Sequence, residues 1–490
     1  MNAHRKIRCS RLRLGAASCL LLICLLLQSL QTVGWLPHTQ PLWLGSARAD
    51  DDGDDGGDDD DGGSTAGPAA TSRAPGPSGA RPGTSRGVSA SPASTPGAAS
   101  ASSGRSEGAR RSSGGGFEPR VGRTDAPLRV DGGTFVADEL LAVNPSAAAL
   151  RRAQTWGATV LEDQRHNNLG FRLVRLRLPP GLDARSASDI GAERDPGVFE
   201  LHRLYTLEQG DDEAACTGAA CEPLQRMGWP PSPARCGSNQ RIGMVDTDVV
   251  TGHPMLQGAS LTVRRFLAPG RTPADGAHGT AVAVILAGQP GHGYAGLLPQ
   301  ARLFAAAPFF VQPSGATTAD AASLVKSLDW LVGQGVRVIG MSLSGPPSLA
   351  LTAAVQQAQR RGVLVAAAAG NGGPQGGPVH PAALDSVLGV TALGSSNRIY
   401  WRASQGDHVD YALPGVDIQV PDEQGALRPR SGTSYAVPFL VAQVSQSLHE
   451  RRLRAVDWRD GRAVPATDLG APGRDPMFGW GLPQVNVVCR

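Results

Sequence analysis

The feature that most constrains this chain is a series of short, almost entirely apolar segments that begins after Cys236. They are rich in Val, Ile, Leu and Ala, and they cover residues 241–245, 301–308, 336–343, 363–369 and 387–392. Such segments are typical of parallel strands that are buried on both faces of a sheet. Between them, residues 321–332 and 349–360 carry apolar side chains at helical spacing. The pattern predicts an α/β domain over residues 211–490, with helices on both sheet faces and a site at the carboxyl ends of the strands.

A second, smaller domain is predicted upstream, over residues 117–210. Segments with strand-like and helix-like patterns follow one another in the order βαββαβ, at residues 139–143, 145–156, 159–162, 171–178, 182–190 and 198–207. Asn167 and Asn168 supply a turn between the second and third strands. This order is typical of a small split α+β domain.

The first 116 residues differ from both domains in composition. Basic residues precede an apolar run at residues 14–30, and Ala47-Arg48-Ala49 resembles a signal peptidase site. We interpret residues 1–49 as an export signal. The run is short for a membrane span, which needs about 20 residues, but an uncleaved signal anchor that enters the membrane through residues 14–30 stays open. Residues 50–116 are rich in Asp and Gly and then in Ser, Pro and Ala, so we expect a disordered linker.

Charge and cysteine content indicate which partners and which cellular compartment to expect. The chain has 46 Lys and Arg residues against 43 Asp and Glu residues, which argues against a nucleic-acid partner. Four cysteines lie beyond the export signal, namely Cys216, Cys221, Cys236 and Cys489. In an oxidising compartment they would form two disulfides, in any of three connectivities. We therefore expect an exported protein, periplasmic or extracellular.

Three residues combine a reactive side chain with a telling position. Ser434 follows Gly432 at the start of a helical segment, where developing negative charge is favoured, although a lone Ser there is more often an N-cap. His278 opens a helix of small apolar residues. Asp246 directly follows a buried strand, where a turn-forming Asp is the alternative. Pro438 is expected in the first turn of the helix after Ser434, where its missing N–H removes no helical bond.

Together these segments resemble the subtilisin-like serine peptidase (subtilase) family. The motifs that carry the resemblance are Val245-Asp246-Thr247, His278-Gly279-Thr280, Ala368-Ala369-Gly370-Asn371 and Gly432-Thr433-Ser434. Their order along the chain, Asp then His then Ser, is the known order of subtilisin. The resemblance implies that Ser434 attacks the peptide carbonyl, His278 transfers the proton and Asp246 orients His278. It also implies that Asn371 donates its side-chain amide to the oxyanion.

The resemblance further implies a groove for an extended substrate. Residues matching Ser342, Leu343 and Ser344 form an edge strand that pairs with the substrate in this family. Residues 367–370, among them Ala368 and Gly370, would line the pocket beneath that strand. Both segments are mostly apolar, so we expect apolar side chains before the scissile bond.

Three positions depart from the family pattern. Asp248 and Ser344 stand where Gly is common, and Tyr435 stands where Met is usual. Asp248 adds a second carboxylate that would bind a cation or face solvent, and Ser344 would narrow the groove. No cofactor is expected to be required, and a structural calcium ion, which is common in the family, has no site that we can assign.

The sequence therefore predicts an exported serine endopeptidase that is made as a precursor and acts on proteins or peptides. Residues 117–210 resemble the family's propeptides, which would make this domain an intramolecular inhibitor, and we expect cleavage between about residues 207 and 238. A retained accessory domain is the alternative. A catalytically silent subtilisin-fold binding protein and an esterase are the competing functions, but the Gly-x-Ser-x-Gly segment of many esterases is not found around Ser434.

Overall fold

The computed structural model describes residues 130–131, 134–208, 223–230, 233–462 and 464–489. All of them belong to one compact unit, Gly114–Arg490. The predicted export signal and linker lie outside the described residues, so these predictions are untested. Within the described ranges, no helix has both the length and the apolar character that a membrane crossing requires.

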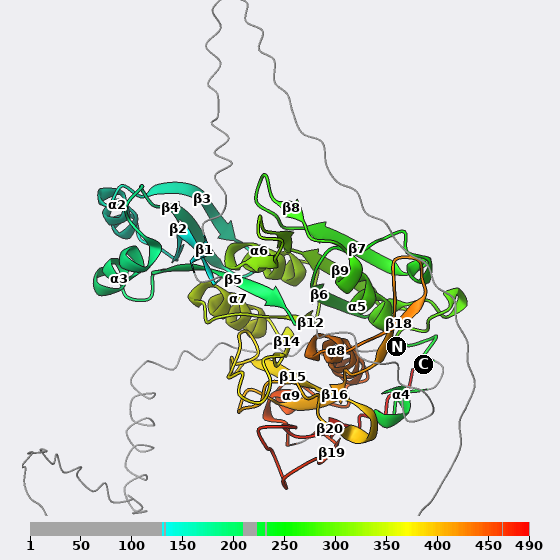
Figure 1. The fold of residues 1–490 in the computed structure, drawn as a ribbon. Helices are drawn as coiled ribbons and strands as arrows, with labels where there is room; N and C mark the ends of the chain where they lie inside the picture. Colours follow the sequence, from blue (N-terminus) through cyan, green and yellow to red (C-terminus); the bar gives the residue numbers. More distant parts are fainter. Residues whose placement is uncertain (1–129, 132–133, 209–222, 231–232, 463, 490) are drawn as a thin grey trace, which may run out of the picture. The chain divides into compact units, whose positions relative to one another are not determined.

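The centre of the larger domain is a seven-stranded parallel sheet (Figure 1). Its strands run in the order β16, β15, β14, β12, β6, β9 and β7. Their bounds are Tyr411–Pro414, Val387–Leu393, Leu364–Ala368, Val338–Met341, Arg241–Val245, Arg302–Ala307 and Ser260–Arg265, in that order. The five predicted strands are confirmed. The two outermost strands were not predicted, because β16 is short and β7 alternates polar with apolar residues, as a half-exposed edge strand does.

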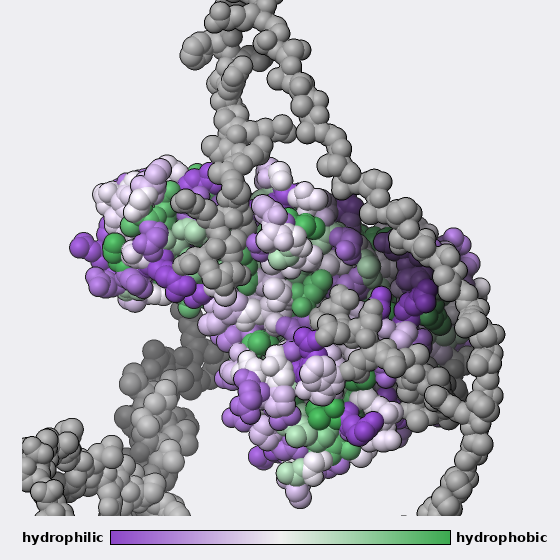
Figure 2. Space-filling view, in the orientation of Figure 1, coloured by the Kyte–Doolittle hydropathy of each residue, from purple (hydrophilic) through white to green (hydrophobic). Residues whose placement is uncertain are grey.

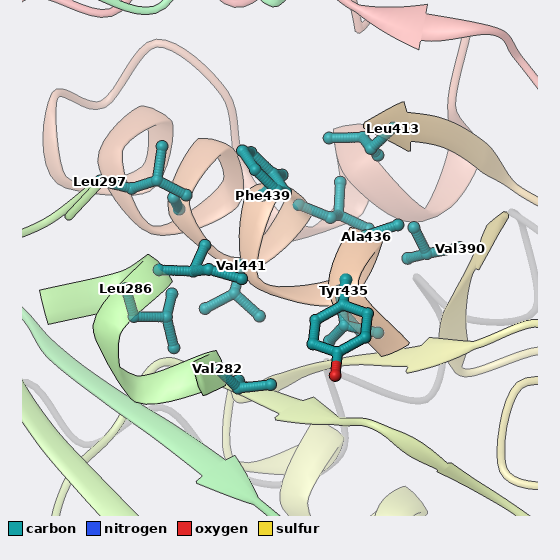
Figure 3. Close-up of a cluster of buried hydrophobic side chains, with 14 of the residues drawn as sticks. Val282, Leu286, Leu297, Val390, Leu413, Tyr435, Ala436, Phe439 and Val441 are labelled. Atoms are coloured by element: carbon teal, nitrogen blue, oxygen red, sulfur yellow. The ribbon is translucent and has the colours of Figure 1, made fainter. Parts of the chain in front are cut away.

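Helices cover both faces of this sheet, as predicted. On one side lie α5 (Ala277–Ala287) and α8 (Thr433–His449), and on the other lie α6 (Ala321–Gly333) and α7 (Leu349–Arg360). Strand β14 shows why its sequence is continuously apolar. Leu364, Ala366 and Ala368 pack into the cluster of α5 and α8, whereas the intervening Val365 and Ala367 pack into the cluster of α6 and α7. Figure 3 shows α8 inside the first cluster, with Val282 and Leu286 of α5 facing it.

The smaller domain has the predicted βαββαβ order. Its elements are β2 (Phe135–Val143), α2 (Ala147–Thr155), β3 (Thr159–His166), β4 (Phe171–Arg177), α3 (Ala184–Arg194) and β5 (Phe199–Leu207). The strands pair antiparallel in the order β3, β4, β2, β5. Ser146 and Asp183 cap the two helices with side-chain oxygens. Phe135, Leu140 and Phe199 belong to the domain's own hydrophobic core.

Strand β5 joins the two domains into one sheet. Besides β2, it pairs antiparallel with β11 (Thr317–Asp320) and β13 (Leu343–Ser344) of the larger domain. The sheet continues through β10 (Phe310–Val311) to β8 (Thr272–Pro273), and nine strands take part in it. On the face in view, hydrophobic surface is broken into small areas between hydrophilic ones (Figure 2).

The remaining elements are short and lie mainly around the larger domain. They are β1 (Val130–Asp131), α4 (Pro223–Arg226), η2 (Pro254–Leu256), η3 (Pro290–His292), η4 (Ser395–Asn397), β17 (Ile418–Pro421), β18 (Leu427–Arg430), α9 (Ala455–Asp460), β19 (Ala466–Thr467) and β20 (Leu482–Pro483). A disulfide joins Cys236 to Cys489 and so ties the start of the larger domain to its end. Cys216 and Cys221, the other two cysteines that were expected to form disulfides, lie outside the described residues.

Candidate active site

Asp246 and His278 are brought together at the carboxyl end of β6. Asp246 follows the last residue of that strand and is fully buried. Its Oδ1 accepts a hydrogen bond from the Thr247 backbone N–H at 2.8 Å and lies 2.7 Å from His278 Nδ1. Gly279 allows this approach, because a Cβ atom there would lie 2.6 Å from the Thr247 carbonyl oxygen. The start of α5 therefore contacts the loop after β6 directly.

Ser434 completes a continuous hydrogen-bonded chain. It is the second residue of α8, and its Oγ lies 2.9 Å from His278 Nε2. With a proton on Nδ1 shared with Asp246, Nε2 is free to accept the hydroxyl proton of Ser434. The three side chains come from three separate elements, and all are buried. The structure thus places together the three residues for which the sequence predicted a common role.

Asn371 lies beside Ser434 with its amide group oriented. Its Oδ1 accepts hydrogen bonds from the backbone N–H and the hydroxyl of Thr433, at 3.1 and 3.0 Å. These bonds turn Nδ2 the other way. Nδ2 is buried, and the described part of the chain offers it no hydrogen-bond partner. A buried donor without an acceptor is costly in a folded protein, so an acceptor supplied by a substrate would satisfy it.

Pro438 was predicted in the first turn of the helix, and this prediction is wrong. Helix α8 already begins at Thr433, which puts Pro438 inside it. A proline at this position cannot donate to the carbonyl of Ser434, four residues earlier. That carbonyl instead accepts a hydrogen bond from the Ser342 hydroxyl at 3.3 Å. Ser342, from the predicted substrate strand, thereby stabilises the backbone of Ser434.

The predicted substrate strand is paired with the smaller domain. Leu343 and Ser344 form β13, which pairs with Leu207 and Thr206 of β5. One residue further on, the Glu208 backbone N–H donates to the Ser342 carbonyl at 3.3 Å. Ala368 ends β14, and the Gly370 backbone N–H donates to the Thr433 hydroxyl at 3.3 Å, so both lie in the same region.

Glu208 was not singled out in the sequence, yet it lies at the centre of the site. The Ser434 backbone N–H donates to its carbonyl oxygen at 3.3 Å. The residue is only 8 % exposed, and its side chain accepts a hydrogen bond from the Ser344 hydroxyl. Burial raises the pKa of the Glu208 carboxyl, although Ser344, the Asn371 backbone N–H and the charge of Arg402 each act to lower it.

A second buried group of charges lies where β5 contacts the larger domain. His202 of β5 has Nδ1 at 2.9 Å from Glu139 of β2, and Nε2 at 3.2 Å from Asp320 at the start of α6. Burial alone would lower the pKa of His202, but Asp320 and Glu139 together raise it to about 9. Burial acts to raise the pKa of both carboxyl groups, yet His202 holds both below their usual values. No local sequence pattern identifies this group.

Two of the departures from the family pattern have simple structural roles. Asp248 was expected to bind a cation or to face solvent. In the structure its Oδ2 accepts a hydrogen bond from Arg265 Nε at 2.6 Å, so its charge is paired with that of Arg265. The Tyr435 ring lies 5.1 Å from the His278 ring, centroid to centroid, and so packs against the imidazole. Within the described ranges, no cluster of three or more His, Cys, Asp or Glu side chains is arranged to hold a metal ion. We assign no calcium site.

Comparison with known proteins identifies the family of the larger domain. The family model described as the subtilase family matches residues 237–481. The chain is 32% identical over 273 residues to the minor extracellular protease Epr of Bacillus subtilis (strain 168), covering 54% of this chain and 41% of Epr. It is 32% identical to subtilisin DY of Bacillus licheniformis, covering 51% of this chain and 90% of that protein. It is 34% identical to the alkaline protease of Alkalihalobacillus alcalophilus, covering 62% of this chain and 78% of that protein.

The fold also matches a solved structure. Fervidolysin from Fervidobacterium pennivorans, described as a keratinolytic enzyme related to subtilisin, superimposes with a TM-score of 0.60 at 21% identity. The match covers 73% of this chain and 61% of fervidolysin.

Proposed function

Because the chain belongs to the subtilase family of serine peptidases, we propose that it is an exported endopeptidase whose catalytic residues are Asp246, His278 and Ser434. The observation that carries this proposal is the hydrogen-bonded chain from Asp246 Oδ1 through the His278 ring to Ser434 Oγ, with contacts of 2.7 and 2.9 Å. A nucleophile, a base within hydrogen-bond reach and a group that orients the base are the parts that acyl transfer needs.

The geometry supports a two-stage hydrolysis. Ser434 Oγ forms a bond to the substrate carbonyl carbon while its proton moves to His278 Nε2, and the carbonyl π electrons move to the oxygen. When the C–N bond breaks, His278 returns the proton to the leaving nitrogen and an acyl ester remains on Ser434. Water then attacks this ester, giving its proton to His278, and the released Ser434 regains a proton. Asp246 keeps Nδ1 protonated and stabilises the charged imidazole.

Asn371 is proposed to stabilise the oxyanion. Its Oδ1 is held by Thr433, and its buried Nδ2 has no hydrogen-bond partner among the residues that the structure describes. The Ser434 backbone N–H is a second donor, already bonded to the Glu208 carbonyl. Removing one side-chain donor of this kind reduces turnover by about a hundredfold to a thousandfold in subtilisin itself. We expect a loss of similar size in Asn371→Ala.

Export and precursor processing complete the proposal. The Cys236–Cys489 disulfide supports an oxidising compartment, which agrees with the export signal predicted at residues 1–49. The smaller domain is proposed to act as an intramolecular inhibitor, since β5 occupies the edge strand β13 where an extended substrate would pair. Protein and peptide substrates would reach β13 only after β5 leaves it.

The proposed activity is tested with the full chain expressed with export. Wild type, Ser434→Ala and the control Ser260→Ala, an exposed serine on β7, are each labelled with a fluorophosphonate and assayed for casein cleavage. We expect labelling and cleavage in wild type and in Ser260→Ala. In Ser434→Ala both should be lost, because replacing the nucleophile of subtilisin reduces turnover about a millionfold. Equal behaviour of all three chains would indicate a catalytically silent fold or a contaminating protease.

A further inference from the structure

The end of β5 lies in the active site as a substrate would. The Glu208 backbone N–H donates to the Ser342 carbonyl, and its carbonyl oxygen accepts from the Ser434 backbone N–H, each at 3.3 Å. In acyl transfer, the carbonyl that is attacked has its oxygen at the donors beside the nucleophile. Glu208 therefore occupies the place of the residue before the scissile bond, and β5 supplies the residues that precede it (Figure 1).

This register is fixed three residues earlier by Tyr205. Its ring is fully buried and packs over Gly345, where a Cβ atom would overlap the ring. Its hydroxyl donates to the Pro346 carbonyl at 2.9 Å. A shift of β5 by one residue would turn every side chain to the opposite face of the sheet. Tyr205 would then leave its pocket, so the residue beside Ser434 is Glu208 and not a neighbour.

The pocket around the Glu208 side chain supplies hydrogen-bond donors to its carboxyl group. The Ser344 hydroxyl donates to Oε1, and the Asn371 backbone N–H bonds the same carboxyl group. Arg402 adds a positive charge nearby. An apolar side chain would leave the Ser344 hydroxyl and this N–H buried without a partner, which costs more than a hydrogen bond gains. This differs from the apolar preference that the sequence led us to expect.

We propose that this pocket selects glutamate as the residue before the scissile bond, and that Ser344 is the specificity-determining residue that contacts its carboxyl group. The proposal rests on the proposed peptidase function and names its substrate class. The first substrate of the enzyme is then its own bond on the carboxyl side of Glu208. Its hydrolysis consumes one water molecule and yields a new carboxylate at Glu208 and a new amine on the following residue.

The test uses the self-processed active enzyme and peptides built on its own sequence, residues 205–210, with Glu, Gln, Met or Leu at the place of Glu208. Met matches the length of Glu but lacks its oxygens. We expect kcat/KM to be at least about tenfold higher for Glu than for Met, because the Met peptide leaves both donors unpaired. Gln, with one acceptor oxygen, should lie between them.

Ser344→Gly removes the hydroxyl and restores the residue that is common in the family. We expect the Glu-to-Met ratio of kcat/KM to fall by about tenfold or more. Fluorophosphonate labelling of Ser434 is measured alongside, to show that the variant is folded and carries its nucleophile. Ser344→Ala serves as a second variant if the glycine variant does not fold, and Ser260→Ala is the matched control. Wild type that cleaves after Met or Leu as fast as after Glu would overturn the inference, provided that it is labelled. Absence of labelling in wild type would instead overturn the proposed function.

The pH dependence gives an independent readout. Burial raises the pKa of the Glu208 carboxyl above its usual value, so a seated glutamate binds a proton more tightly than a free one. As pH falls from that raised value toward about 4.3, the value for a free glutamate, the ratio of cleavage after Glu to cleavage after Gln should rise. Effects of pH that are common to both peptides cancel in this ratio. A Glu-to-Gln ratio that decreases as the pH is lowered would contradict the proposed binding of glutamate in this pocket.

Discussion

Two buried acid sites, one on strand β5 and one directly after its end, are built in opposite ways. At the His202 group, two carboxylates share an imidazolium, and the pKa of Glu139 and of Asp320 is lowered. At the end of β5, Glu208 is held by a hydroxyl and a backbone N–H, and its pKa is raised. The first arrangement pairs opposite charges directly, whereas the second holds the carboxyl group through hydrogen bonds, with the positive charge of Arg402 nearby.

The difference matches what each end of β5 has to do under the proposed function. His202 contacts Glu139 of the smaller domain and Asp320 of the larger one, so the His202 group links the two domains. The pocket around Glu208 stabilises the carboxylate little relative to water, as its raised pKa indicates. A newly cut end can therefore leave such a seat, and another glutamate can enter it. Under the proposed function, the His202 group keeps β5 in place, whereas Glu208 binds reversibly in the active site.

The largest expected effect comes from breaking the His202 group. His202→Gln removes the positive charge between Glu139 and Asp320, and we expect the free energy of unfolding to fall by about 3 to 5 kcal/mol. The measurement is urea unfolding at pH 7 in the Ser434→Ala background, which prevents self-cleavage. His292→Gln, an exposed histidine of η3, is the control. Equal, small losses in both variants would show that the His202 group does not hold the domains together.

A pH titration sharpens the same comparison. The pKa of His202 is raised from about 6.5 to about 9, so its contribution to stability is fully present below pH 6.5 and is lost as pH rises through 9. We expect about 3 kcal/mol of the stability difference between the Ser434→Ala chain and its His202→Gln derivative to vanish between pH 6 and pH 10. A difference that stays constant over this range would mean that His202 is neutral in the folded chain.

The smallest effect is expected at the other end of β5. Glu208→Gln, again in the Ser434→Ala background, keeps the shape of the side chain and one acceptor oxygen for Ser344. We expect the free energy of unfolding at pH 7 to change by less than about 1 kcal/mol, since a raised pKa means that the charge itself gains little from the pocket. A loss as large as that in His202→Gln would remove the contrast between the two ends.

The sequence predicted those parts of the molecule whose cause is local. Strand β14 is apolar throughout because both of its faces are buried, and Asp246, His278, Asn371 and Ser434 lie in short motifs. Strand β7, half exposed at the sheet edge, lacks such a run and was missed. The start of α8 was predicted to within one residue, but Pro438 was placed in its first turn, whereas the helix begins at Thr433 and Pro438 lies further inside it.

The two acid sites could not be predicted, because their partners come from distant segments. His202 is a lone histidine in a strand until β2 and α6 bring Glu139 and Asp320 against it. Glu208 is one acidic residue among several before Cys216, and only the pairing of β5 with β13 places it beside Ser434. The sequence therefore indicated a substrate groove but not Glu208, and the expected preference for apolar side chains before the scissile bond stays a prediction.

The most direct test of the account is the mass of the fragments that the purified full chain produces, for wild type and for Ser434→Ala incubated side by side. The account predicts a wild-type fragment whose C-terminal residue is Glu208, and a Ser434→Ala chain that stays uncut at this bond. A wild-type chain cut elsewhere, with Glu208 left inside an intact segment, would contradict the seat of Glu208. Cleavage after Glu208 in both chains would contradict the role of Ser434.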